Sequence, residues 1–282
     1  MKAKRGFIMK MTTWKRTTLF ITILSVIAII AVGCNTPKKE EASTNALERI
    51  KSEGKIVIGM MGTYPPYNFL NEKKEVDGFD ADMAREIAKR MGIQAEIVTG
   101  EFSGLIEGLQ KTKFDALISQ VTITDDRKKT IDFSAPYIKN AVNVVVKADN
   151  NTIKSVEDFK GKKIGVGLGT NDEKYLREQV LPKVGDFEIA TYNDVITSLM
   201  DLNTGRIDAT INNVFALKPI VDKNNLKIKA VGEPIKEDVA GVAIKKGQPE
   251  LLEAINKAFD EMKKDGTYAA IHKKWFDVEP TL

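Results

Sequence analysis

The chain has 282 residues, of which 43 are basic, 39 are acidic, one is a cysteine and one is a histidine. A single cysteine excludes an intrachain disulfide, and with one cysteine and one histidine a metal site would have to be built from carboxylates. Six basic residues and no acidic one lie in the first 33 positions, so the remaining chain has 37 basic and 39 acidic residues, a net charge of −2 instead of +4. Lysines and acids alternate in that remainder, which leaves no basic patch for nucleic acid.

The N-terminal segment predicts a lipoprotein signal peptide over residues 1–33. Its basic residues precede an uncharged, mostly apolar run at 17–32, which is short for a membrane-spanning helix and suits a signal-peptide core. Ala-Val-Gly-Cys at 31–34 then matches a lipobox, with Ala where Leu is usual. We expect Cys34 to begin the mature protein and carry its lipid; the alternative is a plain thiol beside an apolar segment cleaved elsewhere. Residues 34–45 are rich in Thr, Pro, Lys, Glu, Ser and Asn and predict a solvated tether.

The rest of the chain predicts two similar α/β lobes, because its strand and helix pattern occurs twice. A short apolar strand after a Gly-Lys turn at 54–59 is repeated at 161–167, and a helix, turn and strand at 105–119 are repeated at 195–212. Strands that alternate with helices at this spacing indicate βα units and a mainly parallel sheet.

Three further helices are predicted from apolar spacing and terminal signals. One runs from its cap at Asp80 to Gly92, and two follow at 250–264 and 267–276. His272 lies in the last of these, and we assign it no chemistry.

Two apolar strands, at 141–146 and 240–244, are expected to cross between the lobes. The first lobe would then comprise 46–140 plus 238–282, and the second would be an insertion at 141–237. Two crossing segments form a hinge, and hinged lobes close on ligands placed at the carboxyl ends of the strands.

The segment from Ser119 to Tyr137 combines a strand end, a helix start and an arginine, a combination that could bind a small carboxylate. Thr124 predicts a helix N-cap, with acids at 125 and 126 in the first turn, where the helix dipole favours them. Arg127 lies in the same turn, which is the wrong end of a helix for a cation, so its presence there indicates an anionic partner. The alternative is a surface arginine that pairs with one of the nearby acids, Asp125, Asp126 or Asp132.

This segment resembles the signature of the family 3 extracellular solute-binding proteins, the receptors of polar amino acid ABC importers. Thr-x-x-Arg at 124–127 and Asp-Phe-Ser-x-Pro-Tyr at 132–137 carry the resemblance, which extends over 54–276. It implies an α/β fold of the type II periplasmic binding protein kind, with two Rossmann-like lobes joined by a two-segment hinge. It also implies a monomer, anchored by lipid at the extracytoplasmic face of the cell membrane, that captures a polar amino acid or similar small carboxylate and passes it to a membrane permease. Neither a cofactor nor a catalytic residue is implied.

The resemblance also implies roles for single residues. Arg127 would hold the α-carboxylate through two hydrogen bonds, which suits the planar guanidinium. The Thr122 hydroxyl and the backbone around Gln120 would contact the α-amino group or the carboxylate, while Tyr64 and Phe102 would form the aromatic walls. The loop at 167–171 would close on the carboxylate from the second lobe, with Thr170 and its glycines exposing backbone N–H groups at a helix N-terminus.

Three positions depart from the family pattern: Met61 stands where some members carry an acid, Gln120 where a small residue is frequent, and Asn213 at the expected ammonium site. Asn213 stands where the family commonly has an Asp that pairs with the ligand's ammonium. An amide accepts a hydrogen bond but neutralises no charge in a water-poor cleft. Four explanations stay open: another acid such as Glu101 or Asp172 substitutes, the amino acid binds weakly, the ligand is not an ordinary α-amino acid, or the correspondence slips by one residue at Asn212.

Two other functions are compatible with this fold. Some similar proteins are cyclohexadienyl or arogenate dehydratases, which would need a general acid or base in the cleft. A ligand-binding sensor module would need no catalytic group and no permease.

Overall fold

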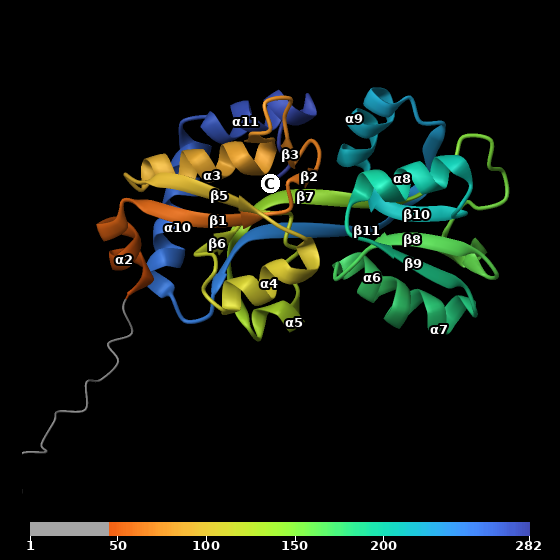
Figure 1. Ribbon diagram of the computed structural model, residues 1–282, viewed down its shortest axis with the longest axis horizontal. Coiled ribbons are helices and arrows are strands. Elements are labelled where there is room, and N and C mark those ends of the chain that lie inside the picture. The colour runs from red at the N-terminus through yellow and green to blue at the C-terminus, as the bar shows by residue number, and fades with distance from the viewer. Residues whose placement is uncertain (1–44) are drawn as a thin grey trace, which may run out of the picture. The chain divides into compact units, whose positions relative to one another are not determined.

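The computed structural model describes residues 45–282, which contain an eight-stranded sheet with the strand order β5-β1-β6-β11-β7-β10-β8-β9 (Figure 1). The expected signal peptide at 1–33 and the lipidation site Cys34 lie outside the described residues, as does the tether up to residue 44. Within 45–282, every helix is too short or too polar to cross a membrane.

The first lobe is built on three parallel strands, β5, β1 and β6. The elements around them are α2 (Ala46–Glu53), β1 (Lys55–Met60), β2 (Thr63–Tyr64), β3 (Asn68–Leu70), β4 (Val76–Asp77), α3 (Phe79–Arg90), β5 (Gln94–Thr99), α4 (Phe102–Gln110), β6 (Ala116–Leu117), α5 (Asp125–Lys128), α10 (Pro249–Lys264) and α11 (Thr267–Phe276). Strands β2, β3 and β4 form a separate small antiparallel sheet. The helix predicted from Asp80 begins one residue earlier, after Gly78, so Asp80 lies inside the helix and is not its cap.

The second lobe repeats this arrangement with the parallel strands β10, β8 and β9. Its elements are η1 (Val156–Phe159), β8 (Lys163–Gly167), α6 (Asn171–Tyr175), η2 (Leu176–Val180), α7 (Leu181–Val184), β9 (Glu188–Tyr192), α8 (Val195–Thr204), β10 (Ala209–Asn213) and α9 (Val214–Asn224). The side chains of Asp194 and Asn213 accept hydrogen bonds from the first turns of α8 and α9, which explains where these helices begin.

Two long antiparallel strands, β7 (Ile131–Lys147) and β11 (Ile228–Lys245), run through both lobes (Figure 1). They pair antiparallel with β10 and β6, so the sheet is mixed, and parallel pairing is confined to each lobe's own strands. Their register shifts at three places, which include the stretch between Val231 and Lys236. The expected crossovers at 141–146 and 240–244 lie within these two strands; the exact lobe boundaries stay a prediction.

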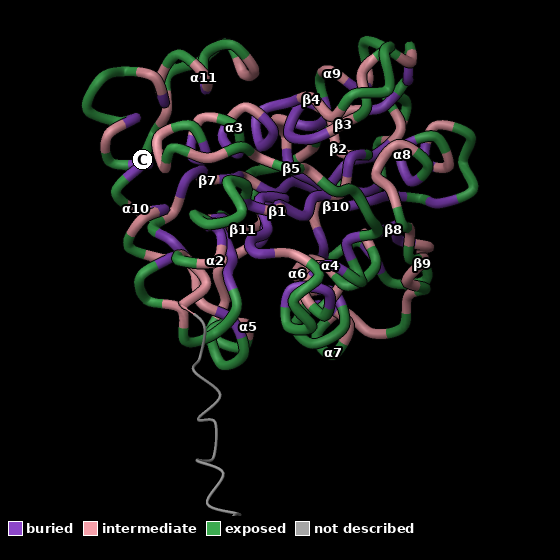
Figure 2. The backbone as a smooth tube through the Cα atoms, turned by 60° about the vertical axis from the view of Figure 1, so that its left-hand side comes forward, coloured by how far each residue is buried: buried purple, intermediate pink, exposed green. Residues whose placement is uncertain are grey.

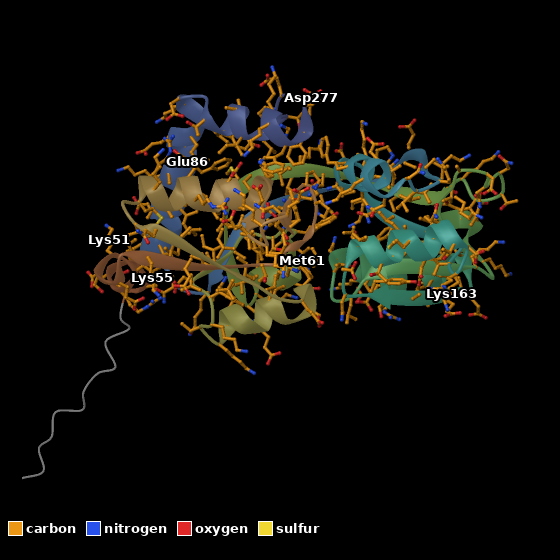
Figure 3. The ribbon with its side chains drawn as sticks, turned by 45° about the horizontal axis from the view of Figure 1, so that its top comes forward. Lys51, Lys55, Met61, Glu86, Lys163 and Asp277 are labelled. Carbon is orange, nitrogen blue, oxygen red and sulfur yellow. The ribbon has the colours of Figure 1, made fainter. Side chains whose placement is uncertain are left out.

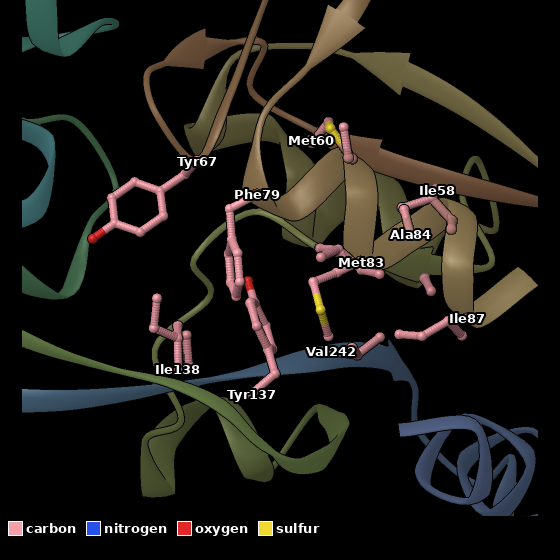
Figure 4. Close-up of a cluster of buried hydrophobic side chains, with 14 of the residues drawn as sticks. Ile58, Met60, Tyr67, Phe79, Met83, Ala84, Ile87, Tyr137, Ile138 and Val242 are labelled. Carbon is pink, nitrogen blue, oxygen red and sulfur yellow. The ribbon is translucent and has the colours of Figure 1, made fainter. Parts of the chain in front are cut away.

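Two apolar cores stabilise the sheet, and the first also takes in residues of α8 and α9 from the second lobe. In the first lobe, Phe79, Met83, Tyr137 and Val242 pack together beneath α3 (Figure 4). In the second, valines of β7 pack with Phe159 and Leu176. Buried residues concentrate in the strands, and the helices turn exposed residues outward (Figure 2). The two cores fix the strands, and the strands fix where their carboxyl ends meet.

Candidate functional site

The interlobe cavity lies where the strands of the two lobes end. Met61, just after β1, lies on the side of the first lobe that faces the second and lines this cavity (Figure 3). All seven residues that the sequence predicts for ligand binding line it too: Tyr64, Phe102, Gln120, Thr122, Arg127, Thr170 and Asn213. They come from six different segments of both lobes, so the fold brings together residues up to about 150 positions apart in the chain.

Arg127 is held at the wall of the cavity with most of its surface buried. Its Nη1 donates to the Thr122 carbonyl at 2.9 Å, and its guanidinium carbon lies 5.6 Å from the centre of the Phe102 ring. Within residues 45–282 it forms no salt bridge. Burial lowers the pKa of Arg127, and the negative charges of Asp172 and Asp238 oppose that effect.

The three acids that could have paired with Arg127 bind other partners. Asp125 lies near Lys128, Asp126 bonds Lys129, and Asp132 bonds Lys246 at 2.8 Å. The alternative of a surface arginine satisfied by its neighbours is therefore wrong. A largely buried guanidinium with open hydrogen-bond donors favours an anionic partner, since an uncompensated buried charge is costly.

Several hydrogen-bonding groups of the loop before α6 bond other groups of the protein, where the sequence predicts that they are open to an anion. Thr170 caps the helix, because its hydroxyl accepts from the Glu173 N–H at 3.1 Å and donates to the Gly167 carbonyl at 2.7 Å. The Gly169 N–H donates to the Glu173 carboxylate at 2.8 Å, and the Leu168 N–H donates to the Tyr192 carbonyl. Two of the backbone donors expected for an anion are thus taken by the protein itself.

Gln120 directs its side chain into a buried polar network rather than across the cavity. Its Nε2 donates to Asp80 Oδ1 at 2.7 Å, its Oε1 accepts from Asn140 at 2.9 Å, and its N–H donates to the Tyr137 hydroxyl at 3.0 Å. Its φ of 55° is a left-handed conformation that a non-glycine residue adopts rarely, and these bonds hold it there.

Asp80 is the centre of this network and is fully buried. Asn68 Nδ2 donates to its Oδ2 at 2.6 Å, and the Tyr137 hydroxyl donates to its Oδ1 at 3.0 Å. Burial raises the pKa of Asp80 to about 7, although the three donated hydrogen bonds act in the opposite direction. The sequence does not predict this role, because an acid at the start of a predicted helix is more typical of a cap.

Two carboxylates and a lysine lie together at the cavity, with Asp172 on α6 of the second lobe and Lys236 and Asp238 on the crossing strand β11. Asp172 and Asp238 both line the cavity, and Lys236 Nζ lies 2.7 Å from Asp172 Oδ1 and 2.5 Å from Asp238 Oδ2. Burial raises the pKa of Asp172, and Lys236 opposes this shift. Glu101, the other acid considered as a substitute, does not line the cavity; it accepts from Asn193 of the second lobe at 3.0 Å.

Asn212 and Asn213 lie at the end of β10, and their side-chain oxygens accept hydrogen bonds from protein donors. Asn212 Oδ1 accepts from the Tyr64 hydroxyl at 3.1 Å and from the Asn213 N–H at 2.8 Å, and Asn213 Oδ1 accepts from the Phe215 N–H at 3.0 Å. Asn213 therefore acts as a helix cap in this structure. Tyr64 also packs against Tyr67, with ring centres 5.0 Å apart, and so connects the cavity to the first-lobe core.

Comparison with known proteins agrees with this geometry. Residues 56–278 match the model of the bacterial extracellular solute-binding proteins, family 3. The chain belongs to this family. It is 38% identical to the L-cystine-binding protein TcyJ of Escherichia coli K12 over 260 residues, which cover 92% of this chain and 96% of TcyJ. It is 36% identical to the histidine-binding periplasmic protein of the same strain, with 79% of this chain and 88% of that protein covered.

Solved structures of similar proteins share the fold of this family 3 protein. An ancestral arginine-binding protein bound to arginine superposes with a TM-score of 0.76 at 41% identity, covering 79% of this chain and 98% of its own. The ancestral amino acid-binding protein AncCDT-1, a precursor of cyclohexadienyl dehydratase, superposes with a TM-score of 0.75 at 36% identity, covering 82% and 99%. The predicted two-lobed fold is confirmed, and the comparisons support solute binding as the protein's role.

Proposed function

We propose that this protein is the lipid-anchored substrate-binding component of an ABC importer, and that it captures a polar amino acid between its two lobes. The observation that carries the proposal is Arg127, a buried guanidinium without a carboxylate partner in residues 45–282, on the wall of a cavity that both lobes line. A planar guanidinium binds a carboxylate through two parallel hydrogen bonds. The relatives named for cystine, arginine and histidine all bind amino acids, so the α-carboxylate is the natural anion.

The other predicted residues support the same binding mode. Phe102 lies under the guanidinium and limits its motion, Tyr64 forms the opposite aromatic wall, and Thr122 holds Nη1 through its carbonyl. The Thr122 hydroxyl has no partner among the described residues and is free for the amino acid. The mature protein would begin at Cys34, carry its lipid there and work outside the cytoplasmic membrane, where it would deliver the amino acid to a permease.

Binding without catalysis is part of the proposal. The buried ring of His272 contacts the Val278 carbonyl at 2.8 Å and packs on aromatic residues of α3 and α11, away from the residues that line the cavity. AncCDT-1, a precursor of cyclohexadienyl dehydratase, is itself an amino acid-binding protein.

A thermal-shift titration tests the proposal. The mature chain without its lipid-bearing Cys34, residues 35–282, is screened against the twenty L-amino acids and L-cystine. At a hundredfold excess over Kd, a binder stabilises the folded state by about 2.7 kcal/mol, which raises the Tm by roughly 5–10 °C for a chain of this size. Arg127→Ala should abolish this rise.

Arg206→Ala is the matched control, because that arginine is exposed and bonds only Asp201. It should keep the rise in full. If no compound stabilises the protein, or if Arg127→Ala responds like the control, the proposed function is wrong.

A further inference from the structure

The charged side chains at the interlobe cavity fall into an isolated cation and a cluster of two carboxylates around a lysine. Arg127 is the isolated cation and lines the cavity, and Lys236, which does not line it, pairs with the two lining carboxylates Asp172 and Asp238. Asp194 also lines the cavity, but both of its oxygens accept from Thr197 at 2.7 Å, and its charge faces the positive N-terminus of α8.

Each of the two carboxylates beside Lys236 keeps one oxygen free for a further donor. Lys236 bonds Oδ1 of Asp172, while Lys236 and Asn171 bond Oδ2 of Asp238. Oδ2 of Asp172 and Oδ1 of Asp238 have no donor among residues 45–282. The side chains are 25% and 16% exposed, so these oxygens are not sealed inside the protein.

The end of β10 has the opposite chemistry. Backbone N–H groups can only donate, so the bonds from Asn213 N and Phe215 N fix the amide oxygens of Asn212 and Asn213 toward the protein. Their Nδ2 groups have no acceptor among the described residues, although each residue is only 5% exposed. Neither Nδ2 atom is enclosed by protein, and both residues line the cavity, so both amide N–H groups reach its open space.

We propose that Asp172 and Asp238 receive the ammonium of the bound amino acid, and that Asn212 and Asn213 donate hydrogen bonds to an oxygen acceptor elsewhere on it. An ammonium cannot bind at Asn213, because only amide donors face the cavity there. The missing acid at 213 is therefore replaced from α6 and β11, on either side of Lys236. This inference rests on the proposed function, since it takes the carboxylate of the same molecule to lie on Arg127.

The positions of these charges and of the amide donors name the class of amino acid. A zwitterion of zero net charge places its carboxylate on Arg127 and its ammonium on Asp172 and Asp238, whereas the additional cationic group of a basic amino acid would face the amide donors of Asn212 and Asn213. The amide donors select a second acceptor group on the molecule. L-glutamine and L-cystine have both properties, and L-arginine has neither.

The test compares each amino acid with the same molecule lacking its amino groups, by isothermal titration of the mature chain. The pairs are L-glutamine with glutaramate and L-cystine with 3,3′-dithiodipropionate, and L-arginine is titrated alongside. The readout is the affinity ratio within a pair, which isolates the ammonium. In Asp172→Asn and Asp238→Asn this ratio should fall at least about tenfold, the loss expected for a hydrogen bond between charged groups.

Two further variants keep the result decisive. Glu101→Gln replaces the acid that does not line the cavity, and it should leave the ratio within about twofold. The double variant Asp172→Asn/Lys236→Met removes both charges of the ion pair. If Asp172→Asn alone unfolds because Lys236 is left unpaired, the affinity ratio of the double variant is used instead. Retained binding of the deaminated partner shows that each variant is folded.

The outcomes separate this inference from the proposed function. If L-glutamine or L-cystine binds and neither Asp172→Asn nor Asp238→Asn changes the ratio, the ammonium site is wrong and amino acid binding stands. If L-arginine binds most tightly, the assigned class is wrong. If no amino acid binds the wild-type chain, the proposed function fails and this inference fails with it.

Discussion

Asp80 shows how one residue supports the cavity without touching the bound molecule. Its carboxylate holds Gln120 and Asn68, and through them the segment after β6 and the loop between β1 and β3. Asparagine at this position would point an NH₂ group at one of three existing donors. We expect Asp80→Asn to lower the free energy of unfolding by about 1–3 kcal/mol, the usual loss for an unsatisfied buried hydrogen-bonding group.

The pH dependence of stability gives Asp80 a second, more specific signature. Burial raises the pKa of Asp80 to about 7, so between about pH 4 and 7 the folded state holds a proton that the unfolded state has lost. This contribution therefore weakens as pH rises through that window and is constant above it. Urea unfolding of both proteins from pH 4 to 8 should show this fall in the wild type and its absence in Asp80→Asn. An unchanged difference between the two proteins across the window would contradict the assignment.

For single residues, the sequence predicted correctly those that lie close together in one segment of the chain. Arg127 and Thr122 lie in one segment with the family's motif, and both line the cavity as expected. The residues that hydrogen-bond around Asp80 are far apart in the chain, and no sequence motif links them. Asp238 lies beside Glu237 in a charged stretch that is typical of an exposed edge, so nothing there marked it as a cavity residue. Asp172 could be suspected because it follows Thr170 at a predicted strand end.

At the scale of elements, β7 and β11 were predicted too short. The sequence indicated 141–146 and 240–244, but the strands have 17 and 18 residues. Pro136 and several Lys and Asn side chains interrupt the apolar pattern of β7, although the backbone stays extended because it pairs with β11 on one side and β10 on the other. Pairing partners distant in sequence, and not local propensity, decide these lengths.

Helix α4 contains two glycines whose substitution should have opposite effects. Gly104 is exposed, and a Cβ added there would meet no atom within 4 Å, whereas a Cβ on Gly108 would lie 2.6 Å from the Phe114 ring. Gly104→Ala should raise the free energy of unfolding by about 0.5 kcal/mol through helix propensity. Gly108→Ala gains the same propensity but must displace Phe114, and should lower stability by about 1–3 kcal/mol. Urea unfolding of the two variants measures both, and equal effects would show that the packing against Phe114 is unimportant.

At the scale of the whole molecule, the lobes meet through the shared apolar core, in which Phe215 packs on Phe276, and through polar contacts near the cavity. Tyr64 bonds Asn212, Glu101 bonds Asn193, and Asp126 bonds Lys174. The bulged strands β7 and β11 are the continuous connections between the lobes in the part of the chain that is described, so they are the segments that would bend as the lobes separate. Contacts present only in the closed arrangement contribute to affinity by raising the closed population.

The ion pair between Asp126 and Lys174 tests this view because it lies outside the set of residues that line the cavity. Lys174→Met removes a contact between lobes, so we expect the Kd for the tightest-binding amino acid to rise about threefold at low salt and less at 0.5 M salt. Lys129→Met is the matched control: Lys129 bonds the same Asp126, but from the same lobe. It should leave the Kd nearly unchanged, because its contact is present whether the lobes are open or closed. Stopped-flow release should place the Lys174→Met effect in the dissociation rate, and similar Kd values for the two variants would rule out a closing role for the pair.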